Sequence, residues 1–385
     1  MRADDDSRAQ GLRGHVDPSE LPCATRATVA ASAAADVLLR TALSAALTAP
    51  MLSWARPRDL RRERPHLAFY GALAQARDPQ AVFARPASGV PVERSAASRP
   101  LFAAPGAEVD MLRFESPFVA LNPAVRESYA SFEQNRVAWA QRWRHGSEPR
   151  PTLCVIHGFG ASSYWLNSAF FNLPWLFAHG YDVLLYVLPF HGVRQPRAVP
   201  FSGWGLFAHG FAHFNEAILQ GVYDLRVLID HLSAEGVEQV GVTGLSLGGY
   251  TAALLAEVDE RIVLSVPNAP VADMSALIPQ WFPSNLLVAA GASAAGIERE
   301  ELQLALAVHS PLTYPPLIPR ERRMIIGGLG DRLAPPEQTE MLCEHWDGCR
   351  LHWFAGNHVL HWGRGVYQRE MLEFMQEAGF AASGA

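Results

Sequence analysis

The sequence predicts an α/β protein whose core is a doubly wound, mainly parallel sheet. From residue 151 onward, short runs of apolar and β-branched residues alternate with longer helical stretches, a pattern typical of parallel strands covered by helices on both faces. The residues whose side chains or backbone could take part in catalysis or binding directly follow these runs. They are Gly158, His191, Ser246, Asp331 and His358. Because ligand sites in such sheets lie beyond the carboxyl ends of the strands, we expect one site at that edge.

The composition is that of a globular protein with a sizeable core. The chain has 385 residues, of which 49% are hydrophobic and 18% charged, enough for one large or two smaller units. The net charge of −6 is modest and argues against a nucleic-acid partner. We expect neither a secretory signal nor a membrane span, and hence a cytoplasmic protein with reduced cysteines. Cys343 and Cys349 are near enough in sequence to bridge.

Residues 1–105 form an extension with three parts. Residues 1–22 are polar and are expected to be disordered, and the proline-rich residues 77–105 are expected to be irregular. Between them, the Ala- and Leu-rich residues 25–55 favour a helix that Asp36 and Arg40 interrupt. The residues expected to follow one side of this helix are Val29, Ala33, Val37, Arg40, Leu43, Leu47 and Met51.

Several arginines follow this helix, between Arg56 and Arg64. An apolar helix with a basic end is typical of a segment that lies on an anionic membrane surface. Peripheral membrane contact through residues 25–64 is therefore one interpretation. The other, which we favour, is a helix packed on the main domain with a solvated basic end.

Residues 106–385 are expected to form the main domain. An insertion at about 270–320 breaks the alternation with an apolar segment, and its position predicts a cap over the site. Strands are expected at 109–119, 152–156, 182–188, 240–243, 261–266, 323–327 and 350–354, and helices at 127–144 and 204–234.

The stretch Gly244-Leu245-Ser246-Leu247-Gly248 joins a β-branched run to an Ala- and Leu-rich helix. This arrangement is typical of a nucleophile elbow, in which a strand turns sharply into a helix with serine at the apex. The apex residue is forced toward positive φ, and glycines two positions away on each side leave room for the turn. We expect Ser246 to be an exposed nucleophile beside the N–H of Leu247. The alternative is a glycine-rich turn without chemistry.

A serine hydroxyl is a weak nucleophile at neutral pH and needs a base that a carboxylate orients. Asp331 and His358 each follow a later strand, and the chain order Ser246, Asp331, His358 is the one known for catalytic triads on such sheets. His361 is a rival for the base. His352 lies within a strand and is expected to be structural.

The motif His157-Gly158-Phe159-Gly160 follows the first parallel strand. A tetrahedral intermediate needs preorganised N–H donors, and we expect Phe159 and Leu247 to supply them because the glycines let the backbone approach the substrate. A tight turn after a buried strand is compatible with the same residues. His209 and His213 are four residues apart on a helix, but no acidic residue completes a metal site, so neither a metal nor another cofactor is expected.

These motifs, in this order, resemble the α/β-hydrolase superfamily over about residues 150–375. The resemblance implies an eight-stranded sheet, a Ser/Asp/His triad and acyl-transfer chemistry. The motif Leu188-Pro189-Phe190-His191-Gly192 also resembles poorly characterised hydrolase-domain proteins and some prolyl-oligopeptidase-like esterases. The residues that carry the superfamily resemblance are His157-Gly158-Phe159-Gly160, Gly244-Leu245-Ser246-Leu247-Gly248-Gly249, Gly330-Asp331 and Gly356-Asn357-His358.

The sequence therefore predicts a serine esterase for small-molecule esters with small to medium apolar acyl groups. Ser246 would attack the carbonyl, His358 would transfer the proton and Asp331 would orient the imidazole. Two alternatives remain: an acyltransferase with the same triad, and a non-catalytic membrane-associated protein with the same fold. The cap residues expected to form the apolar wall of the substrate site are Trp281, Phe282, Leu286 and Leu287.

Overall fold

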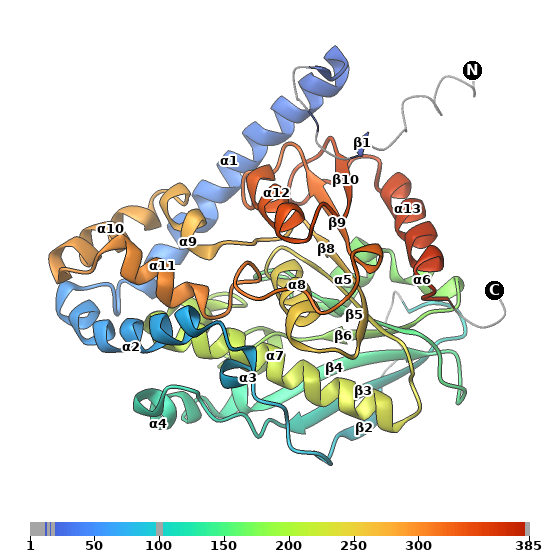
Figure 1. The fold of residues 1–385 in the computed structure, drawn as a ribbon, viewed down its shortest axis with the longest axis horizontal. Coiled ribbons are helices and arrows are strands. Elements are labelled where there is room, and N and C mark those ends of the chain that lie inside the picture. The colour runs from blue at the N-terminus through green and yellow to red at the C-terminus, as the bar shows by residue number, and fades with distance from the viewer. Residues whose placement is uncertain (1–11, 14–15, 17–19, 98–102, 382–385) are drawn as a thin grey trace.

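A ten-stranded sheet forms the centre of the computed structural model, which describes residues 12–13, 16, 20–97 and 103–381 (Figure 1). The expected disorder of residues 1–22 lies largely outside these residues. The strand order is β1-β10-β9-β8-β7-β5-β6-β4-β3-β2. The strands are β1 (Leu12–Arg13), β2 (Glu93–Ala96), β3 (Glu108–Glu115), β4 (Val137–Arg144), β5 (Thr152–Ile156), β6 (Asp182–Tyr186), β7 (Val240–Leu245), β8 (Ile262–Asn268), β9 (Met324–Gly328) and β10 (Arg350–Phe354).

The sheet is parallel from β6 through β5, β7, β8 and β9 to β10. Strand β4 runs antiparallel to both of its neighbours, β3 and β6. The short strands β1 and β2 add one antiparallel edge strand on each side and extend the eight strands that the resemblance implied. The predicted α/β fold with a mainly parallel sheet is confirmed.

Both faces of the sheet are buried, because successive side chains of a strand point to opposite sides. In β5, Cys154 and Ile156 belong to one core, and Leu153 and Val155 belong to the other. Helices α7 (Gly210–Ala234), α8 (Leu247–Val258) and α12 (Pro336–His345) contribute to the first core. Helices α5 (Tyr164–Phe171), α6 (Leu173–Ala178) and α13 (Arg364–Glu377) contribute to the second. The sheet is therefore doubly wound.

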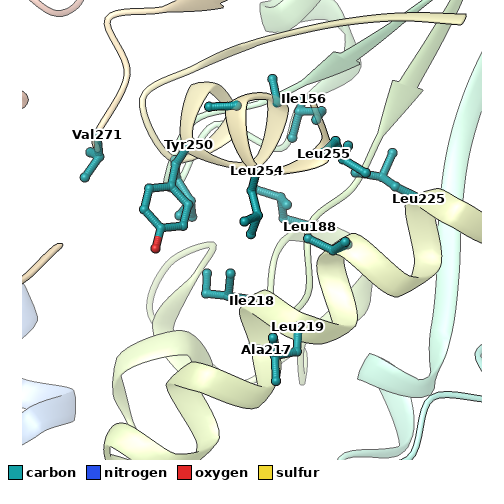
Figure 2. Packing of buried hydrophobic residues seen from close by; sticks show 14 of the residues in the cluster. Ile156, Leu188, Ala217, Ile218, Leu219, Leu225, Tyr250, Leu254, Leu255 and Val271 are labelled. Atoms are coloured by element: carbon teal, nitrogen blue, oxygen red, sulfur yellow. The ribbon is translucent and has the colours of Figure 1, made fainter. Parts of the chain in front are cut away.

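The helix that follows the elbow, α8, is anchored in the first core. Its residues are all buried. Figure 2 shows the side chains of Tyr250 and Leu254 directed toward Ile218 and Ala217 on α7. Because α8 begins at the residue after Ser246, this packing fixes the position of the serine relative to the sheet.

The extension and the insertion are both helical and pack on each other (Figure 1). The extension carries α1 (Cys23–Met51) where a helix was expected, and also α2 (Pro57–Ala76), in the segment that had been interpreted as a basic helix end. The insertion carries α9 (Met274–Leu277), a short 3₁₀ turn (Ile278–Gln280), α10 (Ser284–Ala295) and α11 (Arg299–Ala307). Helix α2 packs along α11, and an ion pair of 2.9 Å joins Arg64 to Glu301.

One expectation about local structure is wrong, and two others are only partly right. Residues 127–144 do not form a helix: a short helix α4 (Arg126–Ala130) precedes strand β4. The aromatic residues in this segment suggested helical spacing, but β4 gains backbone hydrogen bonds from a strand on each side, and tertiary pairing of this kind overrides local pattern. The expected helix 204–234 begins only at Gly210. A separate 3₁₀ turn (Trp204–Phe207) precedes it, and Gly210 has a φ of +88°, which is not helical. The irregular residues 77–105 contain α3 (Pro79–Val82) and β2.

Helix α1 is the one helix in the described part of the chain that is long and apolar enough to cross a membrane by length and composition. No such helix was expected from the sequence. One side of α1 nevertheless carries buried polar residues, Ser32, Asp36 and Ser44, whose exposed fractions are 6%, 0% and 0%. That side packs on the main domain, and the opposite side exposes Leu38.

Candidate active site

The turn after β7 has the geometry of a nucleophile elbow. Ser246 has φ 57° and ψ −113°, and its N–H donates to the carbonyl oxygen of Asn268 over 3.0 Å. Positive φ is strained for a residue with a Cβ, so the surrounding structure must hold it. Its carbonyl accepts from the N–H of Tyr250 at 2.8 Å and so begins α8. Ser246 is partly exposed at the apex between strand and helix.

The two glycines of the motif permit a close approach of the backbone. A Cβ on Gly248 would lie 2.1 Å from the carbonyl oxygen of Ile156, at the end of β5. A Cβ on Gly244 would lie 2.4 Å from the carbonyl carbon of Gly248 and 2.7 Å from the same Ile156 oxygen. No real Cβ tolerates such distances, so both positions require glycine.

Asp331 and His358 are joined by a buried hydrogen bond of 2.6 Å between Oδ2 and Nδ1. The other carboxylate oxygen of Asp331 accepts from the N–H groups of Leu333 and Ala334, each at 2.8 Å. These bonds fix the carboxylate, which is 1% exposed. The hydrogen bond at Nδ1 leaves Nε2 of His358 as the nitrogen able to accept a proton.

Electrostatics around His358 favour its protonated form. Burial alone lowers the pKa of the imidazole. The charge and hydrogen bond of Asp331, together with the charge of Asp36, outweigh burial and raise this pKa above its ordinary value of 6.5. A carboxylate pair beside a buried imidazole stabilises the imidazolium that forms when the histidine takes a proton.

The rival histidines occupy different surroundings. His361 uses both ring nitrogens, one with the hydroxyl of Tyr367 at 3.0 Å and one with the carbonyl of His358 at 3.3 Å. Burial lowers its pKa to about 3. His352 lies within β10 and pairs with Glu370 over 2.6 Å. The geometry therefore favours His358 as the base and a structural role for His352.

The serine and the Asp331–His358 pair lie at the same edge of the sheet. Leu333, whose N–H binds Asp331, lines the same cavity as Ser246. Among the hydrogen bonds between described residues, none joins Ser246 Oγ to His358. Catalytic hydrogen bonds are often long in the free enzyme and tighten when substrate binds.

The expected N–H donors meet at this cavity. Phe159 and Leu247 both line it beside Ser246, and within the described ranges neither backbone N–H has an acceptor. Gly203 makes room for the Phe159 ring, since a Cβ there would lie 2.5 Å from it. The ring packs edge-on against Phe207 at a centroid distance of 5.2 Å.

The cavity above Ser246 is apolar and encloses about 150 Å³. Three parts of the chain line it: the main domain, the cap and the N-terminal extension. Its lining includes Leu47, Met51 and Trp54 from the extension, Phe207, Phe211 and Phe214 from the main domain, and Met274, Leu277, Ile278, Trp281 and Val288 from the cap. The part played by the extension was not expected from the sequence.

The expected apolar wall is only partly as anticipated. Trp281 lines the cavity. Phe282 and Leu286 lie outside its lining and are 55% and 58% exposed, and Leu287 packs against the core instead. The reason is the direction of the helix: α10 turns Ser284 and Val288, one helical turn apart, toward the cavity and the core, which leaves Leu286 on the opposite side.

Sequence reasoning missed Asp36 as a residue of this site. It projects from α1 and is fully buried, and its Oδ2 accepts from the N–H of Arg332 at 2.8 Å and from the N–H of His358 at 3.1 Å. Burial raises the pKa of Asp36, although these two hydrogen bonds act in the opposite direction. The available signal was a lone carboxylate within an apolar helix, which had been interpreted as an interruption.

The described residues contain no cluster of three or more His, Cys, Asp or Glu side chains suited to a metal ion. His213 bonds to Ser128 at 3.0 Å, and His209 packs on the ring of Phe132. All four cysteines, including Cys343 and Cys349, are free thiols.

Comparisons with known proteins agree with this fold. Residues 113–277 match the family model described as "Alpha/beta hydrolase domain containing 18". Acetyl xylan esterase 1 from Thermoanaerobacterium sp. JW/SL YS485 superposes with a TM-score of 0.54 at 16% identity, covering 81% of this chain and 93% of that one. The acetyl xylan esterase from Paenibacillus sp. R4 gives the same values. The class is therefore the α/β-hydrolase fold.

The chain has the α/β-hydrolase fold, and its residues 113–277 are similar to a family of α/β-hydrolase domains. An uncharacterised protein of Mycobacterium tuberculosis, found in strains CDC 1551 / Oshkosh and ATCC 25618 / H37Rv, is 30% identical over 269 residues. That match covers 67% of this chain and 60% of the length of those relatives. The relatives and the solved structures thus share the α/β-hydrolase fold of this chain as their common feature.

The close approach at the elbow predicts the effect of adding one methyl group. Gly248→Ala should destabilise the protein by about 1–3 kcal/mol or more, because the new Cβ must push β5 and α8 apart. Gly365→Ala is the matched control: its Cβ would meet only the end of Arg369, at 3.6 Å, so it should be neutral or slightly stabilising. Urea unfolding compares the two, and equal unfolding midpoints would contradict the elbow packing.

Proposed function

We propose that the chain is a serine hydrolase of carboxylic esters with small to medium apolar acyl groups. The observation that carries the proposal is the strained, partly exposed Ser246 at the base of an apolar cavity, at the same sheet edge as the buried Asp331–His358 pair. A hydrolase with this arrangement performs acyl transfer to serine and then to water.

In the proposed reaction, Ser246 Oγ attacks the ester carbonyl while Nε2 of His358 takes its proton. The N–H groups of Phe159 and Leu247 hold the oxyanion. The imidazolium returns the proton to the leaving alcohol, which departs and leaves Ser246 acylated. His358 then takes a proton from water, whose oxygen attacks the acyl carbon. The imidazolium returns this proton to Ser246 Oγ as the bond from Oγ to the acyl carbon breaks and the acid is released. Asp331 keeps the imidazole in the required tautomer throughout.

The cavity supports the proposed acyl size. An apolar cavity of about 150 Å³ in another protein binds benzene, so a space of this volume suits an acyl group of several carbons. No charged side chain is among the residues that line it. A highly charged acyl group would lose its hydration there without gaining a partner.

The nucleophile assignment predicts that Ser246→Ala retains the fold and lowers kcat by about 10⁴–10⁶. Hydrolysis of p-nitrophenyl butyrate and labelling by a fluorophosphonate probe should both be lost. His358→Ala should have a comparable effect on hydrolysis, whereas His361→Ala, which changes a neighbour that binds Tyr367, should be milder.

Each outcome of these measurements decides something. Undiminished ester turnover by purified Ser246→Ala would exclude Ser246 as the nucleophile. Labelling of the wild type together with acyl transfer to an added alcohol in preference to water would indicate an acyltransferase. A wild-type chain that neither reacts with the probe nor turns over esters would indicate a non-catalytic protein.

The raised pKa of His358 predicts the pH dependence. Its neutral form is the base, so activity is lost as pH falls through the pKa of the folded protein. Because that pKa lies above 6.5, kcat/KM should already decline below neutral pH and fall about tenfold per unit at more acidic pH. A rate of p-nitrophenyl butyrate hydrolysis that stays flat from pH 5 to pH 8 would contradict a histidine base.

The cavity also predicts an acyl-length optimum. Each methylene buried against the apolar lining contributes about 0.8 kcal/mol, roughly fourfold in kcat/KM, so butyryl or hexanoyl esters should exceed acetyl. Trp281→Ala enlarges the cavity and should shift the optimum to longer chains. Leu286→Ala, in α10 of the same cap, changes an exposed side chain outside the cavity and should leave the profile unchanged. A C2 to C12 series of p-nitrophenyl esters tests this, and a preference for acetyl that Trp281→Ala does not alter would refute it.

A further inference from the structure

The N-terminal extension reaches the two loops that carry the acid and the base. We define the acid loop as residues 329–335 and the histidine loop as residues 355–363. Helix α1 passes beside both, and the amide of Asn357 donates to the carbonyl of Ser32 at 3.3 Å. A Cβ on Gly330 would lie 2.8 Å from the Cβ of Ser32. The backbone of the acid loop therefore packs directly against helix α1.

One buried carboxylate joins the two loops. Oδ2 of Asp36 accepts both the N–H of Arg332, in the acid loop, and the N–H of His358, in the histidine loop. Both donors are backbone groups, so the side chain of Asp36 sets the separation of the two loop backbones directly. Asp331 directly precedes the anchored Arg332, and His358 is itself one of the two anchored residues. The 2.6 Å hydrogen bond between these two side chains thus lies next to both contacts of a residue from outside the main domain.

We propose that Asp36 is a positioning residue of the active site, which ties the acid loop to the histidine loop and places a second negative charge beside His358. This inference rests on the proposed function of His358 as the base. Asp36 does not contact the substrate cavity: it acts through the backbone of the two loops and through its charge. Two N–H donors on one oxygen stabilise the charged form of the carboxylate.

The charge of Asp36 should affect how readily His358 is protonated. Asp36 and Asp331 both raise the pKa of this imidazole, so replacing Asp36 by a neutral residue should lower it. The titratable or charged side chains around His358 are Asp331, Asp36, His361, Arg332 and Arg40. Arg40 donates to the carbonyl of Arg332 at 2.9 Å, and Arg332 donates to the carbonyls of Leu329 and Asp331. Both cations are therefore held at backbone oxygens.

The test is the pH profile of Asp36→Asn. The amide keeps an oxygen that can accept both N–H groups but removes the charge. We expect the acidic limb of kcat/KM to move down by about one pH unit, together with a fall in kcat. Asp36→Ala removes the acceptor as well and should lower kcat further. Ser44→Ala is the matched control, because it removes a buried hydrogen bond between the same helix and the carbonyl of Trp281. It should lower stability without moving the limb.

A purely structural role gives a different result. If Asp36→Asn loses stability as Ser44→Ala does and its acidic limb coincides with that of the wild type, the proposal is overturned. If the wild type hydrolyses no ester, the proposed function fails, but the pKa of His358 can still be read by NMR from its ring C–H signals in the wild type and in Asp36→Asn. A lower pKa in the variant supports the positioning role, and an unchanged pKa rejects it.

If the Asp36 variants do not fold, an NMR titration of the wild type alone still tests the proposal. The backbone N–H groups of Arg332 and His358 donate to the same carboxylate oxygen of Asp36. The NMR signals of both amides should therefore shift together when Asp36 titrates. Amide signals that titrate independently, or that show no common step, would contradict the shared carboxylate.

Discussion

The close contact between β5 and α8 governs where chemistry can occur in this protein. The carbonyl oxygen of Ile156 lies so near Gly248 that no side chain fits between them. The strand can therefore turn into the helix only through Ser246 at positive φ, a strained conformation that the packing of α8 on α7 maintains. The same contact places the serine beside Phe159, which follows β5. A backbone contact between two segments distant in the sequence thus sets the relation between the proposed nucleophile and the proposed oxyanion donors.

The remaining parts of the site come from segments outside the sheet. Leu47 and Met51 of the extension and Trp281 of the cap close the cavity over Ser246. Ser44 holds these two segments together, since its hydroxyl donates to the carbonyl of Trp281 and accepts from the N–H of Ser284. Helix α1 is therefore a structural part of the site even though much of its other side is exposed. Its membrane contact, expected as an alternative from its composition, remains a proposal.

Sequence reasoning succeeded where local constraints determine the structure. Strands β5 and β10 have the predicted bounds, because parallel strands buried on both faces are continuous apolar runs. The elbow could be recognised in the sequence because its close backbone packing requires glycine at two fixed positions. The chain order then identified Asp331 and His358 as candidates to act with Ser246, and their catalytic roles remain predictions. The failures involve tertiary contacts: β4 is a strand because two neighbours pair with it, and α1 docks through Ser32, Asp36 and Ser44 as well as through Leu47 and Met51 at the end of its apolar stripe. No periodicity of hydrophobic residues reveals a polar docking face.

The central claim is that Ser246 carries the acyl group during turnover. It is tested most directly by mixing the wild-type chain with p-nitrophenyl butyrate, quenching in acid within one turnover and mapping the peptides by mass spectrometry. An acyl-enzyme mechanism predicts a butyryl group on Ser246 that disappears when the quench is delayed until the substrate is exhausted. Ester turnover with Ser246 unmodified at every quench time, or with the acyl group on another residue, would contradict the claim.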